Sequence, residues 1–179
     1  MVIDNYEWQL IDDKAAGIFT QLIKEGKSIG IVSEAGCPGV ADPGQELVTI
    51  AQQKGVVVKP LVGPNAVLLA LMASGLNGQR FHFHGYLPID NHERSKAIRE
   101  LESESLKKDC TQIFIETPYR NNQVMEALLT HCRPSTRLCV AVDLTGNNEW
   151  IKTRSIAGWQ QDKTDIHKRP AIFLIYAGP

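Results

Sequence analysis

The sequence lacks the features that mark membrane-spanning, secreted and strongly basic proteins. No apolar run in its 179 residues approaches the roughly 18 to 20 residues of a membrane-spanning helix, and the start, MVIDNYEWQLIDD, has neither the basic nor the apolar region of a signal peptide. The formal net charge is only −1, so the binding of RNA would need a local patch. We therefore expect a cytoplasmic chain of ordinary globular composition, with no membrane partner.

Cysteine is scarce and is not arranged as a metal or disulfide framework. The four cysteines have no CxxC spacing, so reduced and mostly buried thiols are expected at Cys37, Cys110, Cys132 and Cys139. His82 and His84 would share one face of a strand, but no third metal ligand accompanies them. We predict no metal site, and two histidines that are hydrogen-bonded or face solvent.

Apolar residues at helical spacing alternate with β-branched runs along the chain, which is typical of an α/β fold. The pattern predicts helices between residues 13 and 26 and over 44–53, 64–73, 91–104 and 121–132. It predicts strands over 28–33, 56–58, 81–87, 112–116, 137–142, 150–154 and 171–178. The pattern of apolar and polar residues changes between residues 75 and 80. We therefore expect one domain over 1–76 and a second mixed α/β domain over 77–179.

Two loops rich in glycine and proline each follow a predicted strand and precede a predicted helix. They are IVSEAGCPGVADPG, residues 31–44, and PLVGPN, residues 60–65. Small residues let the main chain approach a ligand closely, and open α/β sheets bind ligands outside the carboxyl ends of their strands. The two loops are therefore candidate walls of a ligand site built from backbone groups.

Six blocks in this order resemble the tetrapyrrole methylase superfamily. They are VSEAGCPGVADPG, VVVKPLVGPNAVLLALMASGL, FHFHGYLP, IFIETPYRN, DLTGNNEWIKTRSI and RPAIFLIYAG, and the resemblance that they mark extends over essentially all of residues 28–178. Within the superfamily, the likeness is greatest to the branch that contains the ribosomal small-subunit RNA 2′-O-ribose methyltransferase. The resemblance implies two α/β domains with a cofactor cleft between them, usually in a homodimer.

The resemblance also implies S-adenosylmethionine as the cofactor and assigns residues to it by position. Those in the two loops are Gly36, Cys37, Pro38, Gly39, Val40, Gly63, Pro64, Asn65 and Ala66; those of the second domain are Ile115, Thr117, Val142, Asp143 and Ala171. Members of the family begin with a further strand and Gly/Pro-rich loop, followed by about fifty residues of helices and strands. Nothing before Asp12 matches that segment, so we expect the first domain to be incomplete.

A carboxylate near the cleft would be the natural acceptor for the proton of a ribose hydroxyl. Glu34, Glu116 and Asp143 all lie at predicted strand ends, and Glu116 ranks first because Tyr119 and Arg120 follow it closely. Arg120 would then hold a phosphate and Tyr119 would stack on a base. The alternative is that Glu116 and Arg120 form a structural pair that caps the next helix.

Basic residues in and just after the predicted helix 91–104 are a second possible contact for RNA phosphates. These residues are Arg94, Lys96, Arg99, Lys107 and Lys108. They are mixed with glutamates, which favours the alternative of a solvated helix face. We predict a methyltransferase that acts on ribosomal RNA ribose. The alternatives are a methylase of a tetrapyrrole or another small molecule, and a non-catalytic cofactor-binding or dimerisation module.

Overall fold

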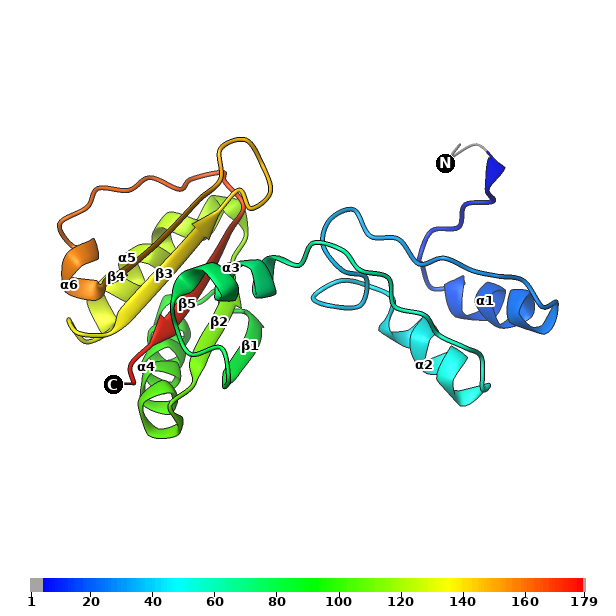
Figure 1. Ribbon diagram of the computed structural model, residues 1–179, viewed down its shortest axis with the longest axis horizontal. Helices are drawn as coiled ribbons and strands as arrows, with labels where there is room; N and C mark the ends of the chain where they lie inside the picture. Colours follow the sequence, from blue (N-terminus) through cyan, green and yellow to red (C-terminus); the bar gives the residue numbers. More distant parts are fainter. Residues whose placement is uncertain (1–4, 179) are drawn as a thin grey trace. The chain divides into compact units, whose positions relative to one another are not determined.

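The computed structural model describes residues 5–178, which form two compact units: one ends at Pro64 and the other begins at Asn65 (Figure 1). This boundary lies before the predicted one at residues 76 and 77. The reason is helix α3 (Ala66–Ser74), whose Ala70 and Leu71 are buried against strands of the second unit. The apolar helix therefore packs as part of the second unit.

The first unit contains two helices, α1 (Ala15–Lys24) and α2 (Gln45–Gln53), close to the predicted ranges. The backbone N–H of Lys14 donates to a carboxylate oxygen of Asp12 over 3.0 Å, and Gly26 takes a left-handed φ of 72° after α1 ends. Four buried side chains form the core between the helices: Ala15, Phe19, Leu47 and Ala51. This core is small.

The strands predicted at residues 28–33 and 56–58 are not formed. Residues 5–64 contain no strand, and neither segment pairs with another part of this unit. A strand needs a neighbouring backbone to complete its hydrogen bonds, so an apolar, β-branched run does not suffice alone. Val57 is accordingly 78% exposed.

The second unit is built on one five-stranded sheet. Its strands are β1 (Phe81–Tyr86), β2 (Thr111–Ile115), β3 (Arg137–Val142), β4 (Trp150–Ser155) and β5 (Ala171–Tyr176), in the order β1-β2-β5-β3-β4. Only β1 and β2 pair in parallel, while β5 is antiparallel to both β2 and β3. The carboxyl ends of β1, β2 and β3 therefore lie at the same edge as the amino end of β5, and we call it the carboxyl edge.

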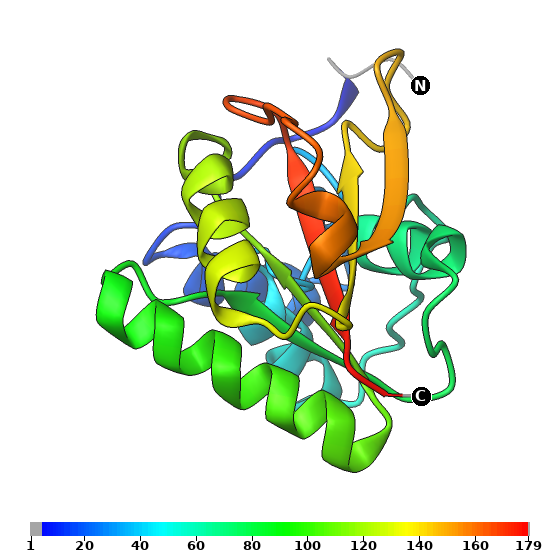
Figure 2. The same cartoon turned by 90° about the vertical axis from the view of Figure 1, so that its left-hand side faces the viewer.

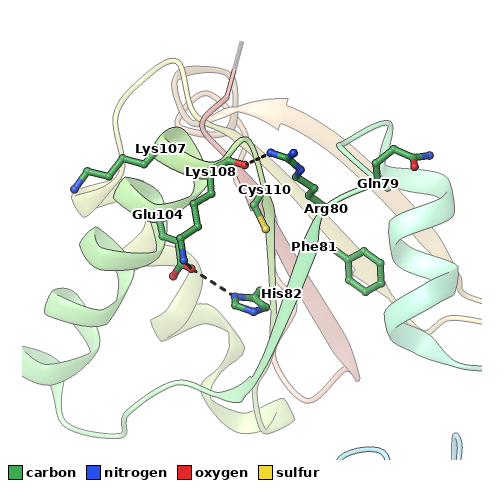
Figure 3. Close-up of a pocket in the computed structure, with 8 residues that line it drawn as sticks. All are labelled: Gln79, Arg80, Phe81, His82, Glu104, Lys107, Lys108 and Cys110. Atoms are coloured by element: carbon green, nitrogen blue, oxygen red, sulfur yellow. Dashed lines mark hydrogen bonds and ion pairs between the residues drawn. The ribbon is translucent and has the colours of Figure 1, made fainter.

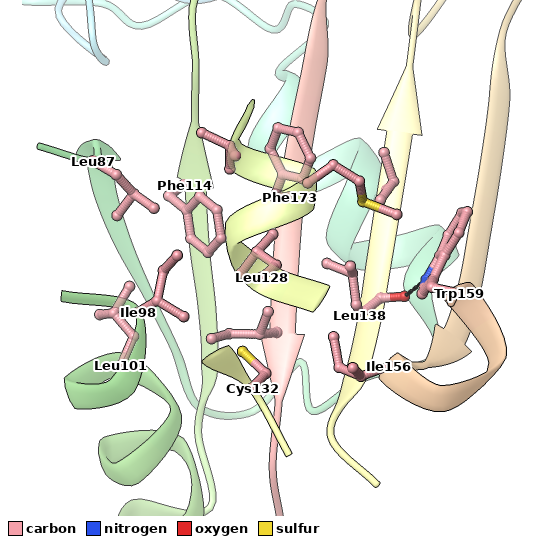
Figure 4. Packing of buried hydrophobic residues seen from close by; sticks show 14 of the residues in the cluster. Leu87, Ile98, Leu101, Phe114, Leu128, Cys132, Leu138, Ile156, Trp159 and Phe173 are labelled. Carbon is pink, nitrogen blue, oxygen red and sulfur yellow. Dashed lines mark hydrogen bonds between the residues drawn. The ribbon is translucent and has the colours of Figure 1, made fainter. Parts of the chain in front are cut away.

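Helices cover both faces of this sheet (Figure 2). On one face α4 (Asn91–Lys108), α5 (Asn121–His131) and α6 (Ile156–Trp159) enclose the larger core, in which the rings of Phe114 and Phe173 stack at 5.7 Å (Figure 4). On the other face α3 covers Ile113 and Leu174, the neighbours of those two residues along their strands. This alternation explains why every strand predicted after residue 80 is formed.

Local signals set most helix ends in the second unit. The Asp90 carboxylate accepts the backbone N–H groups of His92 and Glu93 at the start of α4, and Asp109 ends that helix in a left-handed conformation, later than predicted. The single turn η2 (Pro118–Arg120) and α6 were not predicted. Among the described residues, no helix is both long and apolar enough to cross a membrane.

Candidate functional site

The first Gly/Pro loop is shaped by glycines with positive φ. Gly36 and Gly39 both have a φ of 78°, and Gly44 has a φ of 124° just before α2. The Val40 N–H donates to the Cys37 carbonyl over 3.1 Å, which closes a tight turn around Pro38. L-residues other than glycine rarely adopt such angles, so the loop conformation requires glycine.

The two predicted loops touch within the first unit. The Cys37 thiol lies 3.7 Å from the Pro64 carbonyl oxygen, as a weak donor to it. The next residue, Asn65, belongs to the second unit, and its side-chain oxygen accepts the Leu68 N–H over 3.2 Å to cap α3. Pro64, at which the helix was predicted to begin, thus precedes it, and Asn65 caps it.

The predicted cofactor residues of the second unit gather at the carboxyl edge. Val142 ends β3 opposite Ala171, which begins β5, and Ile115 ends β2 opposite Ile172. Thr117 follows Ile115 after one residue. The sheet register therefore brings the ends of these three strands together.

Asp143 is fixed at this edge by an ion pair with two hydrogen bonds to one carboxylate oxygen. One of its carboxylate oxygens accepts from Arg169 Nε over 2.9 Å and from Arg169 Nη2 over 2.7 Å, while its backbone N–H donates to the Pro170 carbonyl. Asp143 itself has a left-handed φ of 50°. Sequence reasoning missed Arg169, which directly precedes Pro170 and β5, because only the register shows which carboxylate it meets.

Glu116 and Arg120 form the second ion pair of the carboxyl edge. Glu116 Oε1 accepts from the Thr117 N–H over 2.6 Å and from Arg120 Nε over 3.0 Å, and the Arg120 Nη2 contact is 2.5 Å. The Glu116 side chain is fully buried, and its Oε2 has no hydrogen-bond partner within residues 5–178. These contacts favour the structural alternative, in which the pair holds the turn that leads into α5.

Other candidates from the sequence lie away from the carboxyl edge. His84 Nε2 is 2.6 Å from Gln112 Oε1, and His82 lies 3.6 Å from Glu104, so both histidines have partners. Arg94 is buried and donates to the Ile89 carbonyl, which removes it from the predicted basic face. Among residues 5–178, no group of three or more His, Cys, Asp or Glu side chains could hold a metal ion.

A shallow hollow of about 680 Å³ lies at the opposite end of the sheet, where β1 begins (Figure 3). It is lined by Gln79, Arg80, Phe81, His82, Glu104, Lys107, Lys108 and Cys110. Lys108 is paired with Glu104 at 2.7 Å, and Arg80 Nη1 donates to the Lys108 carbonyl over 3.3 Å. Lys108, Glu104 and Arg80 are therefore engaged within the hollow, which contains none of the predicted cofactor residues and neither Glu116 nor Arg120.

Comparisons with known proteins lead to the family that the sequence blocks resemble. Residues 9–157 match the model of the family described as tetrapyrrole (corrin/porphyrin) methylases. The chain is 34% identical over 168 residues to ribosomal RNA small subunit methyltransferase I of Vibrio cholerae, and 41% identical over 106 residues to the protein of that name from Bacillus subtilis. These matches cover 92% and 59% of the chain but 57% and 35% of the relatives. The chain thus spans roughly half the length of the curated relatives it matches.

Solved structures share the fold at lower sequence identity. The methyltransferase CobJ superposes with a TM-score of 0.60 and 20% identity, over 96% of this chain and 73% of that protein. The cobalt precorrin-4 methyltransferase CbiF gives 0.57 and 16%, over 92% and 70%. A uroporphyrin-III C-methyltransferase from Thermus thermophilus, crystallised with S-adenosylhomocysteine, gives 0.50 and 16%, over 93% and 75%. The predicted α/β fold of this family is confirmed.

Proposed function

Because this chain belongs to the tetrapyrrole (corrin/porphyrin) methylase family, we propose that it serves S-adenosylmethionine-dependent methylation of a ribose hydroxyl of ribosomal RNA. The observation that carries the proposal is the shared name of its relatives. Proteins 31–41% identical to it, from organisms as distant as Escherichia coli, Bacillus subtilis and Synechocystis, are all ribosomal RNA small subunit methyltransferases I. A cytoplasmic location and a homodimer belong to the same proposal.

The loop of the first unit fits a cofactor held by backbone groups. A Cβ built on Gly36 or Gly39 would meet nothing within 4 Å among the described atoms, so the main chain there is open to a ligand. Gly36 to Val40, Gly63 to Ala66 and the carboxyl-edge residues Ile115, Thr117, Val142, Asp143 and Ala171 would hold S-adenosylmethionine. When bound, it supplies a methyl group already activated by a positive sulfonium, so the protein chiefly aligns the acceptor and excludes water.

The side chains of the carboxyl edge are suited to positioning. Arg169 holds Asp143 at the end of β3, and Arg120 holds Glu116 at the end of β2. Each carboxylate is thereby kept in one orientation beside the predicted cofactor residues. Glu116 as the acceptor of the ribose proton stays a prediction; its burial means that the side chain would have to turn toward the substrate.

Two measurements test the proposal. Calorimetric titration of the full-length protein that contains this chain should show binding of S-adenosylmethionine and of S-adenosylhomocysteine, and the absence of both would exclude the enzyme interpretation. Mass-spectrometric mapping of ribosomal RNA from a strain that lacks the gene should show one lost ribose methyl group. A complete methylation pattern in that strain would exclude RNA as the substrate and leave the tetrapyrrole or small-molecule alternative, while cofactor binding without any transfer would support the non-catalytic module.

A further inference from the structure

We infer that the exposed ring of Tyr119, together with His167 and Lys168, binds an unpaired nucleotide of single-stranded RNA at the carboxyl edge of the second unit. We call these three residues the Tyr119 platform. The inference rests on the proposed function, because it specifies how that function's RNA substrate is held. It also moves the predicted phosphate contact from Arg120, whose guanidinium is engaged by the buried Glu116, to Lys168.

The Tyr119 platform combines an aromatic face with a positive charge. The Tyr119 side chain is 67% exposed, and the Lys168 ammonium lies 5.9 Å from its ring centre. The His167 ring meets Tyr119 edge-on, with centroids 6.0 Å apart. Proteins bind unpaired RNA by stacking bases on such aromatic rings and by placing cations near the phosphates.

The charge of Lys168 is available to a ligand. Within residues 5–178 its ammonium forms no ion pair with a carboxylate. The nearby carboxylates have other partners: Asp165 accepts from the Asn122 side chain over 2.7 Å and from the His167 N–H over 2.9 Å. Asp143 likewise forms its ion pair with Arg169. Lys168 therefore presents a positive charge that no carboxylate neutralises, beside the exposed ring of Tyr119.

The loop that carries His167 and Lys168 is held in place by hydrogen bonds to the start of α5. The buried Asn121 donates to the Arg169 carbonyl over 2.6 Å, and Asn122 accepts the Ile166 N–H over 3.0 Å. The Lys168 N–H donates to the Pro118 carbonyl over 2.9 Å, with Lys168 itself at a left-handed φ of 60°. A non-glycine residue held in this conformation by its surroundings is typical of functional loops.

The position of the Tyr119 platform matches the proposed reaction. Tyr119 lies two residues after Thr117, and Lys168 lies three residues before Ala171, both predicted cofactor residues of the carboxyl edge. Figure 1 shows the segment between α6 and β5 returning to the end of the sheet at which β3 finishes. A nucleotide stacked on Tyr119 would thus have its ribose near the predicted methyl donor.

The test measures binding of a fluorescent single-stranded RNA decamer to the 179-residue chain by anisotropy, at several salt concentrations. Tyr119→Ala should weaken binding about tenfold through lost stacking, whereas Tyr119→Phe should bind like the original chain. Lys168→Ala should weaken binding severalfold and lower the dependence on salt by about one phosphate contact. The control is the pair Arg80→Ala and Lys107→Ala at the opposite end of the sheet, which should have little effect.

The outcomes separate this inference from the proposed function. Equal binding by the original chain and Tyr119→Ala, or loss of binding only in the Arg80/Lys107 control, would overturn the inference and leave methylation untouched. Tyr119-dependent binding by a chain that neither binds S-adenosylmethionine nor affects ribosomal RNA methylation would support the inference and refute the proposed function. Absence of any RNA binding by the original chain would overturn the inference outright. The thermal unfolding transition, expected to be the same in every variant, reports whether each one is folded.

Discussion

The two units present the predicted cofactor residues by different means. In the first unit a loop with left-handed glycines offers main chain to a ligand, and one small cluster of buried side chains forms the core. In the second unit the residues stand at the end of a sheet with buried clusters on both faces, and two ion pairs fix its carboxylates. The predicted cofactor residues of the first unit therefore depend on backbone conformation, and those of the second unit on packing and charge.

Because the cores differ in size, the loss of a buried side chain should lower the free energy of unfolding more in the second unit, and this is the largest effect that we expect. Phe114→Ala removes a fully buried ring stacked on Phe173 and should lower the free energy of unfolding of the second unit by about 3–5 kcal/mol. Phe19→Ala, in the smaller cluster of the first unit, should cost at most about 3 kcal/mol because fewer neighbours lose contacts. Urea unfolding, with hydrogen exchange to assign each loss to a unit, measures both. Equal losses in both units from either change would contradict this contrast.

The two ion pairs of the carboxyl edge should differ in strength. Arg120→Met leaves the buried Glu116 carboxylate without its partner and should destabilise the chain by about 2–3 kcal/mol. Arg169→Met should cost about 1 kcal/mol, because water reaches both members of its pair with Asp143. The double change Glu116→Gln with Arg120→Met serves as the control and should regain part of the loss. If Arg169→Met proved the more damaging in urea unfolding, the assignment of the buried pair would be wrong.

The contrast between the units also explains what the sequence could predict. Patterns within a few residues placed α1, α2 and the strands of the second unit, since the glycine that ends α1, Gly26, and the alternating runs act locally. They failed for residues 28–33, because a strand depends on a partner elsewhere in the chain. They also missed the pairing of Arg169 with Asp143, which the sheet register creates. The residues of the carboxyl edge could be predicted from family resemblance, and their contacts could not.

The role of backbone conformation in the first unit can be tested with two glycines that differ chiefly in the sign of φ. Neither Gly30 nor Gly36 would place a Cβ within 4 Å of another described atom, but only Gly36 has a positive φ. Gly36→Ala should therefore cost about 1–2 kcal/mol, or distort the loop and weaken the binding of S-adenosylmethionine, while Gly30→Ala should be nearly neutral. Thermal unfolding and calorimetric titration measure the two effects. Equal behaviour of the two variants would show that the loop conformation does not matter.

The rates at which the cysteines are alkylated should also differ between the two units. Burial raises the pKa of Cys132 to about 12 and also raises the pKa of Cys110 and Cys139, all in the second unit. Because the thiolate is the reacting form, these thiols should be alkylated slowly at pH 8, and Cys132 should react more readily only as the pH approaches its pKa. The partly exposed Cys37 of the first loop should react first, and S-adenosylhomocysteine should slow it. Peptide mapping after timed treatment with iodoacetamide gives all four rates. An unprotected Cys37 in a chain saturated with S-adenosylhomocysteine would mean that the loop does not contact the cofactor.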